Sequence, residues 1–370
     1  MDHKAELERL YELMLDGGFE PQALEQGLLE DLDWVARCES NRAGVRLLLS
    51  AVLAKHLEPN LNATQPYTEI EGIGSFSGRT LDERVVGPFL ASKKLPTNST
   101  TAFLTPALRN ISAPLGRDIE LVGSPKGLYS RAVRVLNDVQ DGLADSGSVL
   151  VAILHALEQM RIDNENRLNA LLSKVDKSPD AIGLPSEAIV NLLRQHLACK
   201  NSSRLPVLIV AAVYEAISEG FPERVRTLNA HNAADLQTGA LGDVEVWIET
   251  ETNLVTVYEM KAKAVSDEDI NIAVKKIIAS KSRVDNYLFV TTEPIDSQVA
   301  ERASELYADL GGTEIAILDC IEFARHFLHL FHRYRGTFLD SYQKLVLGEP
   351  DSAVSTNLKQ AFLALRLAAE

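Results

Sequence analysis

The sequence predicts an α/β (α+β) protein in which a mixed sheet with flanking helices follows a mainly helical N-terminal region. The β-rich segments 243–250 and 254–261 surround a short polar turn, which is typical of a hairpin. Two further strands, 286–292 and 313–319, alternate with helices, which is typical of an α/β protein. Before residue 172, apolar residues recur mostly at helical spacing, which indicates the helical region.

The N-terminal elements follow one another with clear breaks. An amphipathic helix is expected over 3–16, and helical sequence continues through 21–58. Residues 59–80 are rich in Pro, Asn, Thr and Gly and predict a loop. The remaining predictions are a short helix at 81–91, a polar turn at 95–102, mostly helical sequence at 126–172 and a connector at 173–186.

The C-terminal elements alternate in type. Besides the four strands, helices are predicted at 186–199, 206–219, 267–280, 296–310, 320–334 and 353–369. Three regions result. We expect a helical region over 1–180, a sheet-bearing core over 186–340 and a helical extension over 341–370.

Composition excludes several classes of protein. The chain has 370 residues, 24% of them charged, and no apolar run of about 18 residues, so we expect no transmembrane helix. The first residues, MDHKAELERLYELM, are charged throughout, unlike a signal peptide. The cysteines Cys38, Cys199 and Cys320 lie too far apart for a recognisable disulfide framework, which favours a cytoplasmic location.

Charge is unevenly distributed along the chain. The net charge is −15, which by itself argues against a nucleic-acid partner. Residues 1–71 contain six basic and fourteen acidic side chains, whereas residues 72–134 contain nine basic and four acidic ones. The second range is therefore a basic segment inside an acidic protein, and an ordinary solvated surface is the alternative interpretation.

The predicted hairpin carries a cluster of ionisable residues. A three-residue turn centred on Thr252 would place Glu259 opposite Glu245 and Asp243 opposite Lys261. Carboxylates crowded in this way repel one another unless a cation compensates them. Mg²⁺ prefers such oxygen ligands and takes phosphate oxygens as well, and a lysine can align a water for attack on phosphorus. The pattern predicts metal-assisted phosphodiester hydrolysis, with a salt-bridged structural hairpin as the alternative.

The pattern Asp, then Glu-x-Lys at the end of the next strand, resembles the PD-(D/E)xK nuclease signature, although no Pro precedes Asp243. A preceding helix and a following helix and strand match the αβββαβ core of that superfamily with one strand uncertain. Glu215 on the preceding helix matches the position of an additional acidic metal ligand in many members, and a solvated helix residue is the alternative. Three blocks, SFSGRTLDERVVGPFL, LPTNSTTAFLTPALRN and HNAADLQTGALGDVEV, resemble the SacI-type family of type II restriction endonucleases.

This resemblance implies a restriction-endonuclease-like fold and Mg²⁺-dependent cleavage of double-stranded DNA at a short site, leaving a 5′-phosphate and a 3′-hydroxyl. It implies that Asp243, Glu259 and Lys261 are catalytic, and that a homodimer reads the site. Metal ligands are expected among Asp243, Glu259, Glu215 and Glu245. Residues expected to contact DNA are Arg79, Arg84, Lys93, Lys94, Asn98, Arg109, His231, Asn232 and Asp235.

Other functions fit the sequence less well. No P-loop or GxSxG elbow is present, so no nucleotide cofactor is expected. A non-catalytic DNA-binding or assembly protein on a nuclease-like fold is one alternative interpretation. A repair or modification-dependent nuclease is another.

Overall fold

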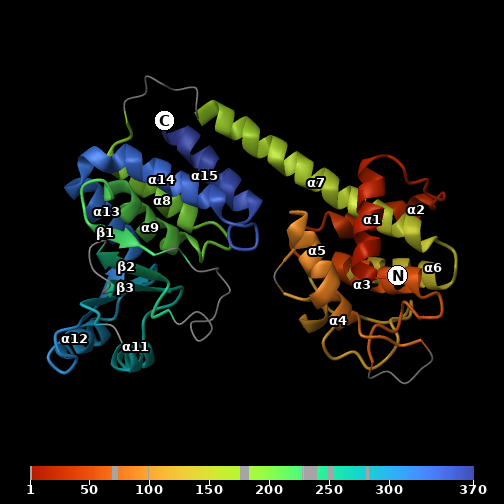
Figure 1. Ribbon diagram of the computed structural model, residues 1–370, viewed down its shortest axis with the longest axis horizontal. Coiled ribbons are helices and arrows are strands. Elements are labelled where there is room, and N and C mark those ends of the chain that lie inside the picture. Colours follow the sequence, from red (N-terminus) through yellow and green to blue (C-terminus); the bar gives the residue numbers. More distant parts are fainter. Residues whose placement is uncertain are drawn as a thin grey trace. The chain divides into compact units, whose positions relative to one another are not determined.

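The computed structural model describes residues 2–68, 74–98, 100–175, 183–226, 228, 240–248, 254–280 and 283–370. The chain divides into two compact units, residues 1–166 and residues 167–370, with separate hydrophobic cores. The division falls inside the long helix α7 (Ser146–Val175) (Figure 1). It therefore lies upstream of the connector expected at 173–186.

Unit 1 is helical and is organised around α3 (Ala43–Leu57). Every residue from Ala43 to Ala54 is buried, which is typical of a helix surrounded by others. It packs against three neighbours whose apolar faces point toward it: α1 (His3–Leu15), α2 (Gln26–Ala36) and α6 (Leu128–Gln140). The predicted helix over 3–16 is thus confirmed, and the helical stretch 21–58 consists of α2 and α3.

The buried guanidinium of Arg46 organises the basic segment of unit 1. It donates to the carboxylate of Asp82 at 2.8 Å and to the carbonyls of Asn98 and Thr100. Asp82 begins one π-helical turn, and its other oxygen accepts from the Ala102 N–H. One buried ion pair therefore ties together the consecutive helical elements here: α4 (Gly78–Leu81), η1 (Asp82–Val86), α5 (Gly87–Ser92) and η2 (Ala102–Leu104).

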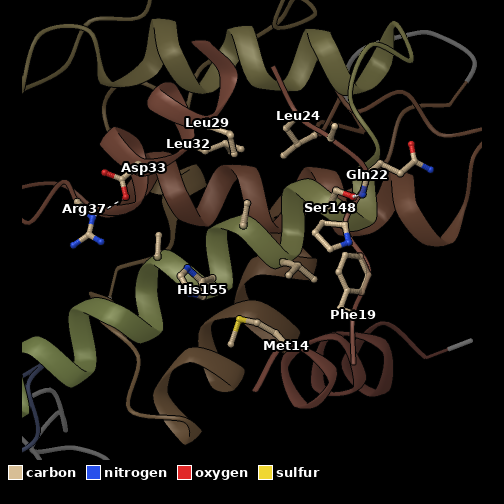
Figure 2. Close-up of a pocket in the computed structure, with 15 residues that line it drawn as sticks. Met14, Phe19, Gln22, Leu24, Leu29, Leu32, Asp33, Arg37, Ser148 and His155 are labelled. Atoms are coloured by element: carbon tan, nitrogen blue, oxygen red, sulfur yellow. Dashed lines mark hydrogen bonds and ion pairs between the residues drawn. The ribbon is translucent and has the colours of Figure 1, made fainter. Parts of the chain in front are cut away.

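A cavity of about 710 Å³ lies between α1, α2 and α7 (Figure 2). Its walls are largely apolar and include Phe19, Leu24 and Leu32. Its polar groups include His155 and the Asp33–Arg37 ion pair. All the residues that line it belong to unit 1, so it is separate from the residues for which the sequence predicts catalysis.

Unit 2 contains a five-stranded mixed sheet in the order β1-β2-β3-β4-β5. The first three strands are antiparallel, and β3, β4 and β5 are parallel. Their bounds are Glu223–Val225, Val244–Ile248, Leu254–Lys261, Asn286–Thr291 and Glu314–Asp319. The predicted mixed sheet is confirmed, and β1 is the strand that the sequence pattern left uncertain.

Helices cover both faces of this sheet (Figure 1). One face carries Val244, Val246 and Tyr258 into a core shared with α8, α9, α13, α14 and α15. The opposite face carries Val257 and Tyr287 into a smaller core with α11 and α12. The bounds are α8 Ser186–Leu197, α9 Leu205–Ile217, α11 Asp267–Ala279, α12 Ser297–Glu305, α13 Cys320–Leu330, η3 His332–Tyr334, α14 Arg335–Gly348 and α15 Thr356–Ala369.

Two elements of unit 2 differ from the sequence prediction. The strand β1 has three residues, too few for a period-two pattern to be visible. The helix α14 follows η3 directly and begins six residues before the helical extension expected over 341–370. The three cysteines are free, and no described helix is long and apolar enough to cross a membrane.

Candidate active site

The strands β2 and β3 form the predicted hairpin, but in a different register. Glu245 pairs with Val257, so the expectation that Glu259 faces Glu245 and that Asp243 faces Lys261 is wrong by two residues. The expectation assumed a three-residue turn, whereas five positions separate the two strands. A shift of two keeps every side chain on its original face. Glu259 and Lys261 therefore still share the face of Val257, toward α11.

Asp243 lies immediately before β2 and is bonded to the peptides on both sides of Glu259. Its N–H donates to the Tyr258 carbonyl at 2.8 Å, and its Oδ2 accepts from the Met260 N–H at 2.7 Å. Gly242, the preceding residue, permits this approach to β3, because its position has no room for a Cβ. The structure thus brings Asp243 beside Glu259, whereas the expected register placed it opposite Lys261, and it leaves Asp243 exposed.

The half-buried carboxylate of Glu259 is held by three side chains. Lys261 Nζ lies 3.3 Å from its Oε1. Lys276 Nζ, from α11, and the hydroxyl of Tyr287, from β4, each lie 3.1 Å from its Oε2. Both oxygens therefore have a partner, and three elements fix the direction of this carboxylate.

Lys261 is held between two carboxylates. Its ammonium lies 3.0 Å from Asp269 Oδ1 as well as beside Glu259, and it packs over the ring of Phe289. Burial disfavours the charged ammonium, but the bond to Asp269 and the charge of Glu259 outweigh it and raise the pKa of Lys261. Burial likewise opposes ionisation of Asp269, but hydrogen bonds from Ser266 and Lys261 lower its pKa to about 2.

Glu245, an expected metal ligand, is buried and has other partners. Its Oε2 lies 3.1 Å from Arg226 Nη1, and its Oε1 accepts from the Leu241 N–H at 2.8 Å. Arg226 also lies over the ring of Trp247. These contacts make Glu245 a support for the segment that leads to Asp243.

Glu215, the other expected ligand, pairs with Lys344 on α14 at 2.6 Å. It lies on α9, which packs against the sheet face opposite to α11, where Tyr214 bonds to the hydroxyl of Tyr258. The described contacts do not join Glu215 to Asp243 or Glu259.

The residues present fit a magnesium ion held by few protein ligands. No group of three or more His, Cys, Asp or Glu able to hold a metal is found in the described part of the chain. Asp243, Glu259 and the Met260 carbonyl nevertheless supply hard oxygens at one strand end. Mg²⁺ commonly uses one or two carboxylates and completes its shell with waters and substrate phosphate.

The charge balance of this cluster differs from the expectation. The sequence suggested several carboxylates with a single ammonium. In the structure Lys276 and Arg226 join Lys261, so three cations pair with the carboxylates of Glu245, Glu259 and Asp269. Repulsion among the carboxylates therefore does not by itself require a metal.

The basic segment is partly neutralised by ion pairs. Four of its nine cations pair with carboxylates: Arg79 with Glu83, Arg117 with Asp138 and Asp141, and both Arg131 and Arg134 with Asp31. The exposed residues Arg84, Lys94 and Arg109 have no ion pair among the described residues, and Lys94 has a φ of 55°. They are the candidates in this segment that remain available to phosphates.

The other expected DNA contacts are less open. Lys93 lies over the ring of Tyr11. Asn98 accepts from Arg46 through its carbonyl and side-chain oxygen. His231, Asn232 and Asp235 lie outside the described residues.

Sequence reasoning missed the partners of Glu259 and Lys261 on other elements, which are Asp269, Lys276 and Tyr287. The first two are seven positions apart on α11, a spacing that places both on one helix face. Tyr287 is the first buried residue of β4. A visible signal was the polar pair on an otherwise apolar helix face, but only packing joins it to β3.

A mixed sheet with helices on both faces, and with Asp243, Glu259 and Lys261 at adjoining strand ends, is compatible with a restriction-endonuclease-like fold. Residues 181–293 match the family model of the SacI restriction endonuclease C-terminal domain. The match includes these three residues and the block HNAADLQTGALGDVEV, and it confirms the resemblance to SacI-type restriction endonucleases over this segment; the blocks at 75–90 and 95–110 lie outside the match. No curated protein matches the chain.

Proposed function

We propose that this protein is a type II restriction endonuclease that makes Mg²⁺-dependent double-strand cuts in DNA at a specific site. One observation carries the proposal. The segment that matches the SacI C-terminal domain contains the two strand ends where Asp243, Glu259 and Lys261 meet. The matching family supports the proposed substrate class, and the residues at the strand ends support the proposed chemistry.

In this proposal Asp243 and Glu259 hold Mg²⁺, with help from the Met260 carbonyl. When bound, the ion supplies positive charge and polarises a phosphoryl oxygen. Lys261 remains an ammonium, because its carboxylate partners raise its pKa. As an ammonium it can donate a hydrogen bond to the attacking water and orient it for attack on phosphorus.

The bond changes balance without a further reactant. The water oxygen forms a bond to phosphorus, and the bond from phosphorus to the 3′-oxygen breaks with inversion. The water loses a proton to solvent, and the leaving oxygen gains one. The products are a 5′-phosphate and a 3′-hydroxyl.

The double-strand cut requires two such sites. A homodimer supplies them with the same two-fold symmetry as a palindromic DNA site. In each subunit Arg84, Lys94 and Arg109 contact phosphates, where cations position the duplex without reading its sequence. Sedimentation of the protein with and without DNA tests the dimer, and a monomer in both states would exclude it.

A second candidate function is a non-catalytic DNA-binding protein on the same fold. The pairing of Glu259 with Lys276 and of Glu245 with Arg226 favours it, because these carboxylates already have cationic partners and their charge needs no metal to offset it. A repair or modification-dependent nuclease differs from the main proposal in lacking a short fixed site.

Incubation of the purified chain with unmethylated phage DNA, in Mg²⁺ or in EDTA, separates these functions. Discrete fragments that require Mg²⁺ support the restriction endonuclease. A Mg²⁺-dependent smear supports a nuclease without a fixed site. Intact DNA that still binds the protein supports the non-catalytic alternative.

The variant Asp243→Asn identifies the site responsible. It removes the negative charge but keeps an oxygen that can accept from the Met260 N–H. We expect cleavage to be lost and DNA binding to be kept. Asp340→Asn, at an exposed carboxylate that pairs with Arg366, is the matched control and should cleave normally.

A further inference from the structure

The backbone carbonyl of Leu241 and the carboxylate of Glu259 share the same two hydrogen-bond donors. Lys276 Nζ lies 3.2 Å from the Leu241 oxygen and 3.1 Å from Glu259 Oε2. The Tyr287 hydroxyl lies 3.1 Å from each of these oxygens. The side chains of Lys276 on α11 and Tyr287 on β4 thus connect the segment before β2 to Glu259 on β3.

The bridged segment is the one that carries Asp243. Leu241 precedes Asp243 by two residues, and its N–H is bonded to Glu245. Both polar atoms of the Leu241 backbone therefore have side-chain partners. Between them and Asp243 lies Gly242, packed against the backbone of β3. This short path leaves little freedom for the spacing between Asp243 and Glu259.

The two donors differ in what they can do. The Tyr287 hydroxyl has one proton and can donate to one of the two oxygens at a time. The Lys276 ammonium has three protons and can donate to both at once. Its charge also compensates Glu259, and the low exposure of both groups, with the Lys276 side chain 21% and that of Glu259 16% exposed, strengthens the pair.

We propose that Lys276 and Tyr287 are positioning residues for the metal-binding carboxylates. Both side chains bind Glu259 Oε2 and the Leu241 carbonyl oxygen. Because Leu241 lies two residues before Asp243, this bridge sets the distance between the carboxylates of Glu259 and Asp243. The inference rests on the proposed function, because it assigns Asp243 and Glu259 to one metal ion. Neither Lys276 nor Tyr287 contacts the substrate in this role.

The variant Tyr287→Phe removes only the hydroxyl. The ring stays in the core, where it packs on Phe289 with 5.4 Å between ring centroids. We expect the affinity for Mn²⁺, measured by calorimetry on the full chain, and the cleavage rate each to fall about tenfold, within the range typical of residues that orient metal ligands. The affinity for DNA in EDTA should not change.

Lys276→Met should have the larger effect, because it removes the donor that reaches both oxygens together with a compensating charge. We expect losses of about 100-fold in the same two measurements. Lys276→Arg keeps the cation and the donors and should recover at least part of both. Recovery by arginine separates positioning from simple loss of folding.

Tyr214→Phe is the matched control. Its hydroxyl is also partly buried at the sheet, but it bonds to the hydroxyl of Tyr258 on the opposite face. It should leave Mn²⁺ affinity and cleavage unchanged, whatever its effect on the melting temperature.

The outcomes separate this inference from the proposed function. If the wild type cleaves and Tyr287→Phe and Lys276→Met equal it in Mn²⁺ affinity and rate, the positioning role is wrong and the nuclease stands. If the wild type binds Mn²⁺ but does not cleave, weaker binding by both variants still supports positioning, and only the nuclease fails. A wild type that neither binds Mn²⁺ nor cleaves overturns both.

Discussion

Three consecutive residues, Leu241, Gly242 and Asp243, are constrained in different ways where the chain enters β2. Leu241 is held through its backbone by Glu245, Lys276 and Tyr287. Asp243 is held by hydrogen bonds to the backbone of β3. The constraint on Gly242 is steric, because a Cβ at this position would lie 2.6 Å from Val257 Cγ1 and 2.7 Å from the Tyr258 carbonyl oxygen.

Gly242→Ala should displace Asp243, because the Tyr258 carbonyl belongs to the backbone of β3 and cannot move alone. We expect a loss of about 1–3 kcal/mol in unfolding free energy, as in overpacked sites. Cleavage should fall about 10²-fold, the scale expected when reacting groups are misplaced by about 1 Å. Urea denaturation and a cleavage time course measure the two effects.

Gly336→Ala is the control for this substitution. Position 336 lies in α14 with open space around it, so alanine should keep the activity and slightly stabilise the helix. Normal cleavage by Gly242→Ala would show that the close approach to β3 does not fix Asp243.

The carboxylate of Asp269 should make stability depend on pH in the acid range. Its pKa in the folded chain is about 2, below the ordinary value of 3.8. Its contribution is therefore fully present above about pH 4 and is lost as the pH falls from 4 to 2. A shift of this size corresponds to about 2 kcal/mol of unfolding free energy.

Asp269→Asn tests this contribution, since the amide keeps an acceptor for Ser266 but loses the charge beside Lys261. The variant should be about 2 kcal/mol less stable than the wild type at pH 7. The gap should close toward pH 2 in urea denaturation experiments. A constant gap across this range would mean that the charge of Asp269 does not contribute.

At the scale of elements, α11 and β3 present complementary charges to each other. The strand offers Glu259 and Lys261, two positions apart, and the helix offers Lys276 and Asp269, seven positions apart. Each charge meets its opposite, because both spacings place the two side chains on one face. The packing of one helix on one strand thus orients both the carboxylate and the ammonium of the candidate site.

The buried Arg46–Asp82 pair plays the corresponding role in unit 1. Asp82→Ala would leave the Arg46 charge buried without its carboxylate, which typically costs about 3–5 kcal/mol. Arg79→Ala, in the exposed pair with Glu83 on the same helical segment, should cost less than about 1 kcal/mol. Chemical denaturation compares them, and equal losses would contradict the assigned anchoring role.

At the scale of the whole molecule, a net charge of −15 must be reconciled with a DNA partner. Ion pairing within unit 1 removes Arg79, Arg117, Arg131 and Arg134 from the available cations. Binding to DNA would then depend on few contacts to phosphate. Such binding is weak at moderate salt, since each neutralised phosphate releases counterions.

Arg84→Ala, Lys94→Ala and Arg109→Ala should each weaken DNA binding and reduce the slope of log affinity against log salt concentration by about 1. Fluorescence anisotropy in EDTA, at several salt concentrations, measures the slope without cleavage. Arg117→Ala is the control, because its guanidinium is already bonded to Asp138 and Asp141. A slope that none of the three substitutions changes would place the DNA elsewhere.

Local sequence patterns predict the strands and most helices of this protein, because side-chain periodicity depends only on near neighbours in the chain. They also predict the position of Asp243, Glu259 and Lys261 at strand ends and a resemblance to SacI-type restriction endonucleases, which the family match confirms over residues 181–293. These features depend on neighbours within a few residues. The short strand β1 could not be predicted in this way, because three residues are too few to show a period-two pattern.

Only the tertiary structure decided the register of β2 against β3 and the partners of each charge. Register depends on the length of the connection, and charge pairing depends on which elements pack together. Lys276 and Tyr287 reach Glu259 because α11 and β4 adjoin β3, and Glu215 meets Lys344 because α9 packs on α14. A sequence pattern identifies side chains able to do chemistry, but their contacts arise from the packing of distant segments.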